Sequence, residues 1–180
     1  MNNPPLFYME KLWSPWRSKY IESFKSDEDK SKCIFCQMND LKAEDTNNLV
    51  VYQGNLAFVV LNLYPYNNGH LMIVPKRHTN DFPNLTKDEI AECMELLQKS
   101  ELALRKVMSP HGFNLGANIG RVSGAGIEEH IHFHIVPRWN GDTNFMPVIG
   151  EVKVISQDLL ETKIKLLEAF NDLNNQSGNK

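Results

Sequence analysis

The chain has 180 residues, of which 42% are hydrophobic, and this length and composition fit one globular domain with a sizeable core. Its formal net charge of −3 argues against a nucleic-acid-binding surface. No apolar stretch approaches the roughly 18 residues that a membrane-spanning helix needs, so we expect no membrane partner. Three cysteines are too few for a disulfide framework in a chain of this length, and we therefore expect a reducing, cytoplasmic compartment.

The first half of the chain predicts three β-strands, at residues 49–52, 57–61 and 70–74. Gly54 and Asn55 form a turn between the first two runs, which indicates a hairpin. Proline has no backbone N–H for a strand ladder, so we expect Pro75 to stop the third strand.

A long helix follows the third predicted strand. Thr86 and Glu89 form a capping box, in which a hydroxyl side chain precedes a glutamate by three residues, and the predicted helix runs from there to about Met108. Apolar residues at helical spacing predict its buried face: Ile90, Met94, Leu97 and Leu104. The spacing therefore indicates a helix that packs on a sheet.

The second half predicts a fourth strand at 113–119, a glycine-rich loop at 120–126 and a fifth strand at 130–136. A C-terminal amphipathic helix is predicted at 156–173, followed by a polar tail at 174–180. Mostly antiparallel strands with one long helix and a C-terminal helix indicate an α+β fold in one domain spanning 1–180.

Three histidines at alternate positions, His130, His132 and His134, are the most informative feature. Successive side chains of a strand point to opposite faces, so the three imidazoles are expected to share one face. Outer members of the run lie about 13 Å apart, too far for one metal ion, so at least one histidine remains for chemistry. Neutral imidazole is a nucleophile and a general acid–base near pH 7.

Cys33 and Cys36 form a C-x-x-C pair, which alone fits half of a zinc site, a dithiol redox motif or simple burial. A redox pair usually opens a helix in a βαβ unit, and no such unit is predicted after it. Zinc would need two further ligands, for which His78 and His130 are available donors. Cys93 lies inside the long helix and is expected to pack there.

The loop at 120–126 contains three glycines, Gly120, Gly124 and Gly126, immediately before the histidine run. Small residues expose backbone N–H groups to an anion, so this loop could hold a phosphate, although a plain flexible loop has the same composition. Asn62 and Asn118 lie near predicted strand ends, where their amides could contact a ribose or a phosphate.

These motifs resemble those of the histidine-triad (HIT) superfamily of nucleotide hydrolases and transferases. Residues 130–136 match its H-φ-H-φ-H-φ-φ signature, and residues 68–78 are similar to its second landmark, a G-H-x-L-V-x-P strand. The likeness covers about residues 33–140, with 1–30 as an N-terminal arm and 141–180 as a C-terminal extension. Residues 13–17 and 138–147 further resemble a longer bacterial branch that includes diadenosine tetraphosphate phosphorylases.

The resemblance implies a role for each matching residue. His132 would attack the α-phosphorus, His134 would assist the leaving group, and His70 would support both. Asn62 matches a ribose-contacting position, and Asn118 an amide that contacts the α-phosphate. In zinc-bearing members the ligands match Cys33, Cys36, His78 and His130. Any zinc would be structural, no catalytic cofactor is implied, and the family's usual state is a homodimer.

The implied activity is nucleotidyl transfer from a dinucleoside polyphosphate or a nucleoside phosphoramidate, with adenine nucleotides as the expected substrates, through a nucleotidyl-histidine. One alternative is phosphorolysis of diadenosine tetraphosphate, in which phosphate is the acceptor. An alternative from another functional class is a nucleotide-binding module with little turnover. One departure from the family is Ile127, which stands where many members carry a serine that contacts the phosphate or leaving group.

Overall fold

The described part of the chain is an antiparallel sheet with helices on both faces. The computed structural model describes residues 33–142, 155 and 157–177, and in these residues five strands pair in the order β1-β2-β3-β5-β4. The strands are β1 (Val50–Gln53), β2 (Ala57–Leu61), β3 (Leu71–Pro75), β4 (Gly112–Ala117) and β5 (Phe133–Arg138). The helices are α2 (Ile34–Met38), α3 (Lys87–Met108) and α5 (Leu159–Ser177), with short 3-10 turns η1 (Phe82–Asn84) and η2 (Arg121–Ser123). The predicted α+β class is confirmed.

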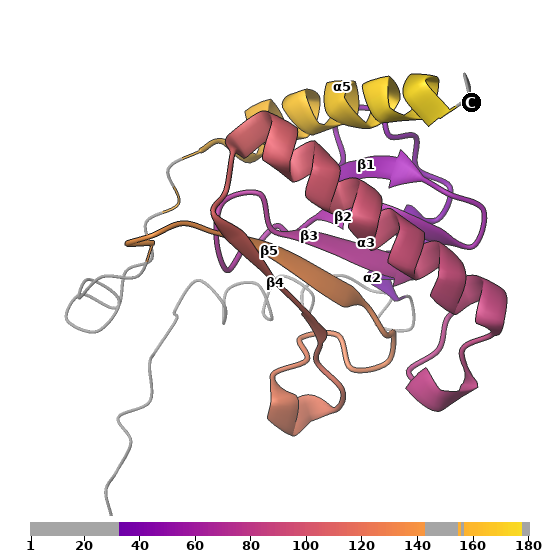
Figure 1. The fold of residues 1–180 in the computed structure, drawn as a ribbon. Helices are drawn as coiled ribbons and strands as arrows, with labels where there is room; N and C mark the ends of the chain where they lie inside the picture. Colours follow the sequence, from indigo (N-terminus) through magenta and orange to yellow (C-terminus); the bar gives the residue numbers. More distant parts are fainter. Residues whose placement is uncertain (1–32, 143–154, 156, 178–180) are drawn as a thin grey trace, which may run out of the picture.

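Two hydrophobic clusters cover the two faces of this sheet. Helices α3 and α5 lie across one face (Figure 1), where Leu71, Ile73 and Ile135 belong to a cluster with Leu104 and Phe170 of the helices. The alternate strand residues Val60, Met72 and Val74 lie on the other face and form a second cluster with Phe35 of α2. The face that the long helices leave open is therefore the face on which the site can form.

The division of the chain into arm, core and extension stays a prediction. Residues 1–32 and 143–154, which hold the whole predicted N-terminal arm with its motif at 13–17 and part of the predicted C-terminal extension, lie outside the described residues. No helix among the described residues is long and apolar enough to cross a bilayer.

The capping box of α3 is confirmed, but the predicted buried face of this helix is partly wrong. The Thr86 side chain accepts from the Glu89 N–H, and the Glu89 carboxylate accepts from the Thr86 N–H. Leu97 and Leu104 are buried, whereas Ile90 and Met94 are 40% and 42% exposed. The buried stripe of α3 also contains Glu89, which pairs with Arg77 at 2.7 Å, and Ile90 and Met94 lie outside that stripe.

Strand β5 begins at Phe133, three residues later than predicted, although the predicted alternation holds. Ile131, Phe133 and Ile135 belong to the cluster beneath α3 and α5. The ladder with β3 ends at the pair Ile73 and Phe133. Pro75 cannot donate a ladder hydrogen bond, and its carbonyl pairs with the ring of His130 instead, so residues 130–132 precede the strand.

Helix α5 starts three residues after the predicted position and continues four residues further, to Ser177. Its Lys163 is fully buried, and the ammonium group donates to the carbonyl oxygens of Asp45 and Asn48, the latter at 2.8 Å. These bonds fasten α5 to the segment that leads into β1. A buried ammonium is stable in such a place only because these acceptors replace water.

We expect Lys163→Met to lower the free energy of unfolding by about 2 kcal/mol, because two main-chain acceptors lose a charged donor. Lys165→Met is the matched control, since Lys165 is exposed and pairs only with Glu161 one turn away; its loss should cost less than about 0.5 kcal/mol. Urea unfolding measures both. Equal stability of the two variants would contradict the assigned role of Lys163.

Candidate active site

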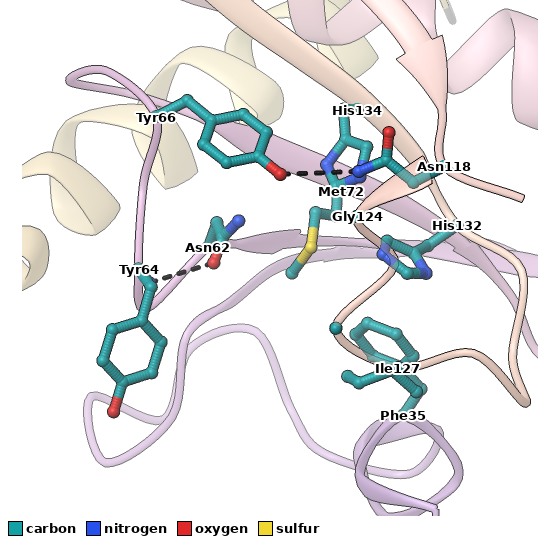
Figure 2. A pocket seen from close by; sticks show the side chains of 11 residues that line it. Phe35, Asn62, Tyr64, Tyr66, Met72, Asn118, Gly124, Ile127, His132 and His134 are labelled. Carbon is teal, nitrogen blue, oxygen red and sulfur yellow. Dashed lines mark hydrogen bonds between the residues drawn. The ribbon is translucent and has the colours of Figure 1, made fainter. Parts of the chain in front are cut away.

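A pocket opens on the face of the sheet opposite α3 and α5. The open space that it encloses, counted together with the solvent at its mouth, is about 490 Å³. Figure 2 shows the side chains that converge on it from α2, the β2–β3 loop, β3, the β4–β5 loop and β5. The lining residues are Phe35, Asn62, Tyr64, Tyr66, Met72, Asn118, Gly124, Gly126, Ile127, His132 and His134.

His132 enters this pocket with its tautomer fixed by the backbone. Its Nδ1 lies 2.9 Å from the carbonyl oxygen of His130, and because a carbonyl only accepts, Nδ1 carries the proton. Burial lowers the pKa of His132, and the hydrogen bond to His130 opposes this in part. A neutral ring protonated at Nδ1 has its lone pair on Nε2, which is the form of imidazole that attacks an electrophile.

His70 and His134 form a relay whose proton positions are also determined. The Tyr66 N–H and the Asn62 Nδ2 amide lie 3.0 and 3.2 Å from Nδ1 of His70, so this nitrogen is the acceptor. His70 Nε2 therefore carries the proton and donates to His134 Nδ1 at 2.9 Å. This leaves the proton of a neutral His134 on Nε2, where it can be donated to a bound group.

The two chemical roles lie side by side. The ring centroids of His132 and His134 are 4.8 Å apart. The ring of His132, which carries the nucleophilic nitrogen, therefore neighbours the ring of His134, which carries a hydrogen-bond donor. Such a pair can attack an electrophile and stabilise, by a hydrogen bond, the negative charge on the group that leaves it. The structure thus brings together three residues predicted from the sequence, His70, His132 and His134.

The glycine-rich loop forms the wall beside His132. Asn118, Gly124 and Gly126 all line the pocket, as predicted, and Gly124 has a φ of +93°, a conformation that glycine adopts without strain. Ile127 lines the same wall and packs against the cluster around Phe35. At this position the site therefore offers an apolar side chain, and a phosphate would depend on backbone and amide groups instead.

Four further predicted residues gather at a second cluster behind His132. Cys33 and Cys36 flank the start of α2, His78 follows β3, and His130 precedes β5. Their ligand atoms all lie within 4.8 Å of one another. Nδ1 of His130 is 3.3 Å from Cys33 Sγ, and Nδ1 of His78 is 3.3 Å from Cys36 Sγ. No βαβ unit follows the pair among the described residues, so the redox alternative has no structural support there.

The donor set of this cluster fits a closed tetrahedral zinc site. His130 Nε2 donates to the Pro75 carbonyl at 2.7 Å, which leaves the lone pair of Nδ1 directed to the cysteines, as in ligands with an outer hydrogen-bond partner. Burial and the nearby Cys33 thiol raise the pKa of Cys36. A divalent cation between the sulfur atoms would offset this and stabilise both thiolates.

Sequence reasoning missed several pocket residues. Phe35, Tyr64, Tyr66 and Met72 line the pocket, although they were not among the predicted site residues. The proline, asparagine and glycine residues of the segment 64–69 are typical of a turn, and a turn by itself predicts no ligand contact. The available signal was two aromatic residues in a turn directly before His70, a position where a purely structural turn needs neither.

Comparisons with known proteins agree with this geometry. The model of the HIT domain matches residues 43–141. AP-4-A phosphorylase of Mycobacterium tuberculosis is 42% identical over 158 residues, which cover 86% of this chain and 81% of that protein. An uncharacterised HIT-like protein of Methanocaldococcus jannaschii is 34% identical, covering 74% of this chain and 98% of that protein.

Among solved structures, a Zn-bound histidine triad family protein from Mycobacterium smegmatis superposes with a TM-score of 0.65 at 25% identity, covering 83% of this chain and 99% of that one. The domain match spans more than half of the chain, and its residues include the whole histidine run. The chain therefore belongs to the HIT domain family.

Proposed function

We propose that this protein transfers a nucleotidyl group from a dinucleoside polyphosphate to inorganic phosphate, with His132 as the nucleophile. The observation that carries the proposal is the fixed tautomer of His132, whose bond to the His130 carbonyl leaves Nε2 able to attack in a pocket beside His134. The 42% identical relative is named as an AP-4-A phosphorylase, which supports phosphate over water as acceptor and a dinucleoside polyphosphate over a phosphoramidate as donor.

In the first step, His132 Nε2 forms a bond to the α-phosphorus of the substrate, and the bond from this phosphorus to the bridging oxygen breaks. His134 Nε2–H donates a hydrogen bond to the departing oxygen and stabilises the negative charge that develops there, and His70 holds the other nitrogen of that ring through the 2.9 Å hydrogen bond. The leaving group is the remaining nucleoside polyphosphate. A nucleotidyl-histidine remains on His132.

In the second step, an oxygen of inorganic phosphate attacks the same phosphorus and the bond to His132 breaks, which yields a nucleoside diphosphate. Water in place of phosphate yields a nucleoside monophosphate. The acceptor enters the space that the leaving group vacated, so the two reactions share every protein group and differ in the occupant of one subsite.

The binding roles of the remaining predicted residues belong to this proposal. Asn118 and the backbone N–H groups around Gly124 and Gly126 would contact the α-phosphate, where negative charge develops. Asn62 would contact the ribose; in support, it lines the pocket while its amide also contacts His70. The base would lie against the apolar wall of Phe35 and Ile127. Adenine nucleotides are the proposed substrates because the 42% identical relative is named for one.

We expect His132→Ala to lower kcat for diadenosine tetraphosphate by at least about a thousandfold, because it removes the atom that forms the covalent bond. His111→Ala is the matched control, since His111 is exposed before β4 and takes no part in the pocket. Intact-mass measurement should detect a nucleotidyl adduct on the wild-type protein and none on His132→Ala.

Labelled inorganic phosphate distinguishes the acceptors in the same assay. Label in the nucleoside diphosphate product supports phosphorolysis. Unlabelled nucleoside monophosphate as the product would show that water is the acceptor and that the reaction is hydrolysis. If a folded His132→Ala variant kept more than about a tenth of wild-type kcat, the assignment of His132 as the nucleophile would be wrong. Nucleotide binding without any turnover of the wild type would favour a binding module.

We also propose a structural zinc ion held by Cys33, Cys36, His78 and His130. The clustered donors and the Zn-bound relative support it. Bound zinc would hold α2, the segment after β3 and the start of the histidine run together, with no open position for substrate. Two reduced cysteines are needed for this role, which agrees with a cytoplasmic location.

Elemental analysis should find about one zinc per chain, and Cys36→Ser should lose it with a fall in Tm of roughly 5 °C or more. Cys93→Ala is the matched control because Cys93 is buried in α3, away from the cluster. Cys93→Ala leaves a small cavity and lowers Tm slightly, but it should retain the metal. Metal-free wild-type protein with unchanged Tm in Cys36→Ser would rule the site out.

We further propose a homodimer formed through β4. This strand lies at the edge of the sheet, and its Leu115 is 59% exposed opposite Ile135, on the face that α3 covers. Ile119, just past the strand, is 54% exposed. An uncovered strand edge with apolar side chains is suited to pairing with a second copy.

Sedimentation analysis should find a dimer, and Leu115→Lys should shift the equilibrium to monomer, because a charge would be buried in the interface. Leu160→Lys is the control, since Leu160 is 41% exposed on α5, the helix that packs over β1 at the opposite edge. Monomeric wild-type protein, or a dimer unaffected by Leu115→Lys, would contradict this interface.

A further inference from the structure

Tyr66 lies between the histidine relay and the phosphate side of the pocket. It belongs to the loop between β2 and β3, and Figure 2 shows its ring extending across the pocket toward Asn118 and His134. The residues that it reaches come from separate parts of the chain, His70 before β3 and Asn118 after β4. A side chain in this position can hold both at a defined separation.

The first set of contacts fixes His70. The Tyr66 N–H donates to Nδ1 of His70 at 3.0 Å, and the two rings stack with centroids 4.8 Å apart and planes 25° from parallel. The Tyr66 ring also lies 5.8 Å from the ring of His134. Backbone and ring of one residue therefore hold the orientation of His70, and through it that of His134.

The second contact is made by the phenol oxygen. Asn118 Nδ2 donates to Tyr66 Oη at 3.4 Å, a long hydrogen bond that Figure 2 marks by a dashed line. A carboxamide can rotate by 180° and present either its oxygen or its nitrogen, and only the nitrogen can donate to a phosphoryl oxygen. The phenol oxygen accepts one N–H of this amide, which holds the Asn118 side chain against Tyr66 and leaves the second N–H for a phosphoryl oxygen.

The loop that carries Tyr66 is itself anchored to the end of β5. Asn67 Nδ2 donates to the Pro137 carbonyl at 3.1 Å and to Asp142 Oδ2 at 2.9 Å. Arg138 pairs with the same carboxylate at 2.6 Å, which lowers the pKa of Asp142 to about 2 and keeps it ionised. Tyr66 thus projects from a rigid support.

We propose that Tyr66 is a positioning residue of the nucleotidyl-transfer site, whose backbone and ring orient the His70–His134 relay and whose hydroxyl orients the amide of Asn118 toward the α-phosphate. This inference rests on the proposed function for its chemistry. Tyr66 joins the group that donates a hydrogen bond to the leaving oxygen to a group that stabilises charge on the α-phosphate, so one side chain positions both.

The test is a double-mutant cycle with Tyr66→Phe and Asn118→Ala. The phenylalanine keeps the ring stacking and the backbone bond but loses the hydroxyl, so kcat should fall about tenfold with KM changed less than about threefold. In an Asn118→Ala background the same change should have almost no further effect, because the hydroxyl acts through that amide. Tyr66→Leu should lose more than Tyr66→Phe because the stacking on His70 is also removed.

Tyr52→Phe is the control for loss of a phenol, since Tyr52 stacks on Phe170 beneath α5 and should keep wild-type kinetics. The proposal would be overturned if the decreases in kcat of the two single variants multiplied in the double variant. It would also be overturned if the kcat of Tyr66→Phe lay within twofold of wild type. NMR of the substrate-free protein gives a second test that does not depend on turnover. The side-chain amide signals of Asn118 should shift in Tyr66→Phe and not in Tyr52→Phe, and unmoved signals would overturn the proposal even if the enzyme splits a different substrate.

Discussion

The site depends on the backbone carbonyl of His130. This oxygen holds Nδ1 of His132 and thereby decides which nitrogen can attack. The carbonyl is in place because the His130 ring is held on both sides, by the Pro75 carbonyl at 2.7 Å and by the Cys33 sulfur at 3.3 Å. A neutral nucleophile is then maintained by burial, which lowers the pKa of His132. A substitution in the cluster of Cys33, Cys36, His78 and His130 that moves the His130 carbonyl would therefore alter the orientation of the His132 ring.

The orientation of the relay follows from a second constraint, the short loop before β3. Two donors converge on Nδ1 of His70, and the direction of every later hydrogen bond in the relay follows from that acceptor. The same loop is fixed to β5 through Asn67, and His134 is part of β5. Relay and support therefore share one piece of sheet, which limits the relative motion of His70 and His134.

Features set by local chemistry could be predicted from the sequence, and features set by long-range contacts could not. The alternation of His130, His132 and His134 required only the period of an extended chain, and the capping box of Thr86 and Glu89 only the start of a helix. The burial of Glu89 could not be predicted, because its carboxylate is paired with Arg77, twelve residues away, and Ile90 and Met94 lie outside the buried stripe that contains it. Tyr66 was missed for the same reason, since its contact with Asn118 joins residues 52 positions apart. The roles of the site residues remain proposals, although the structure brings the predicted members together.

Ile127 connects the unusual sequence of this site with its physical character. An isoleucine beside His132 and Phe35 gives no hydrogen bond to a phosphate, but it packs into an apolar cluster and excludes water from one side of the nucleophile. Lower polarity strengthens the remaining interactions with developing charge, because each is screened less. The cost is that fewer groups orient the phosphate. With the hydroxyl absent from position 127, orientation depends more strongly on Asn118, and the support that Tyr66 gives to this amide becomes more important than it would be in a site with a serine.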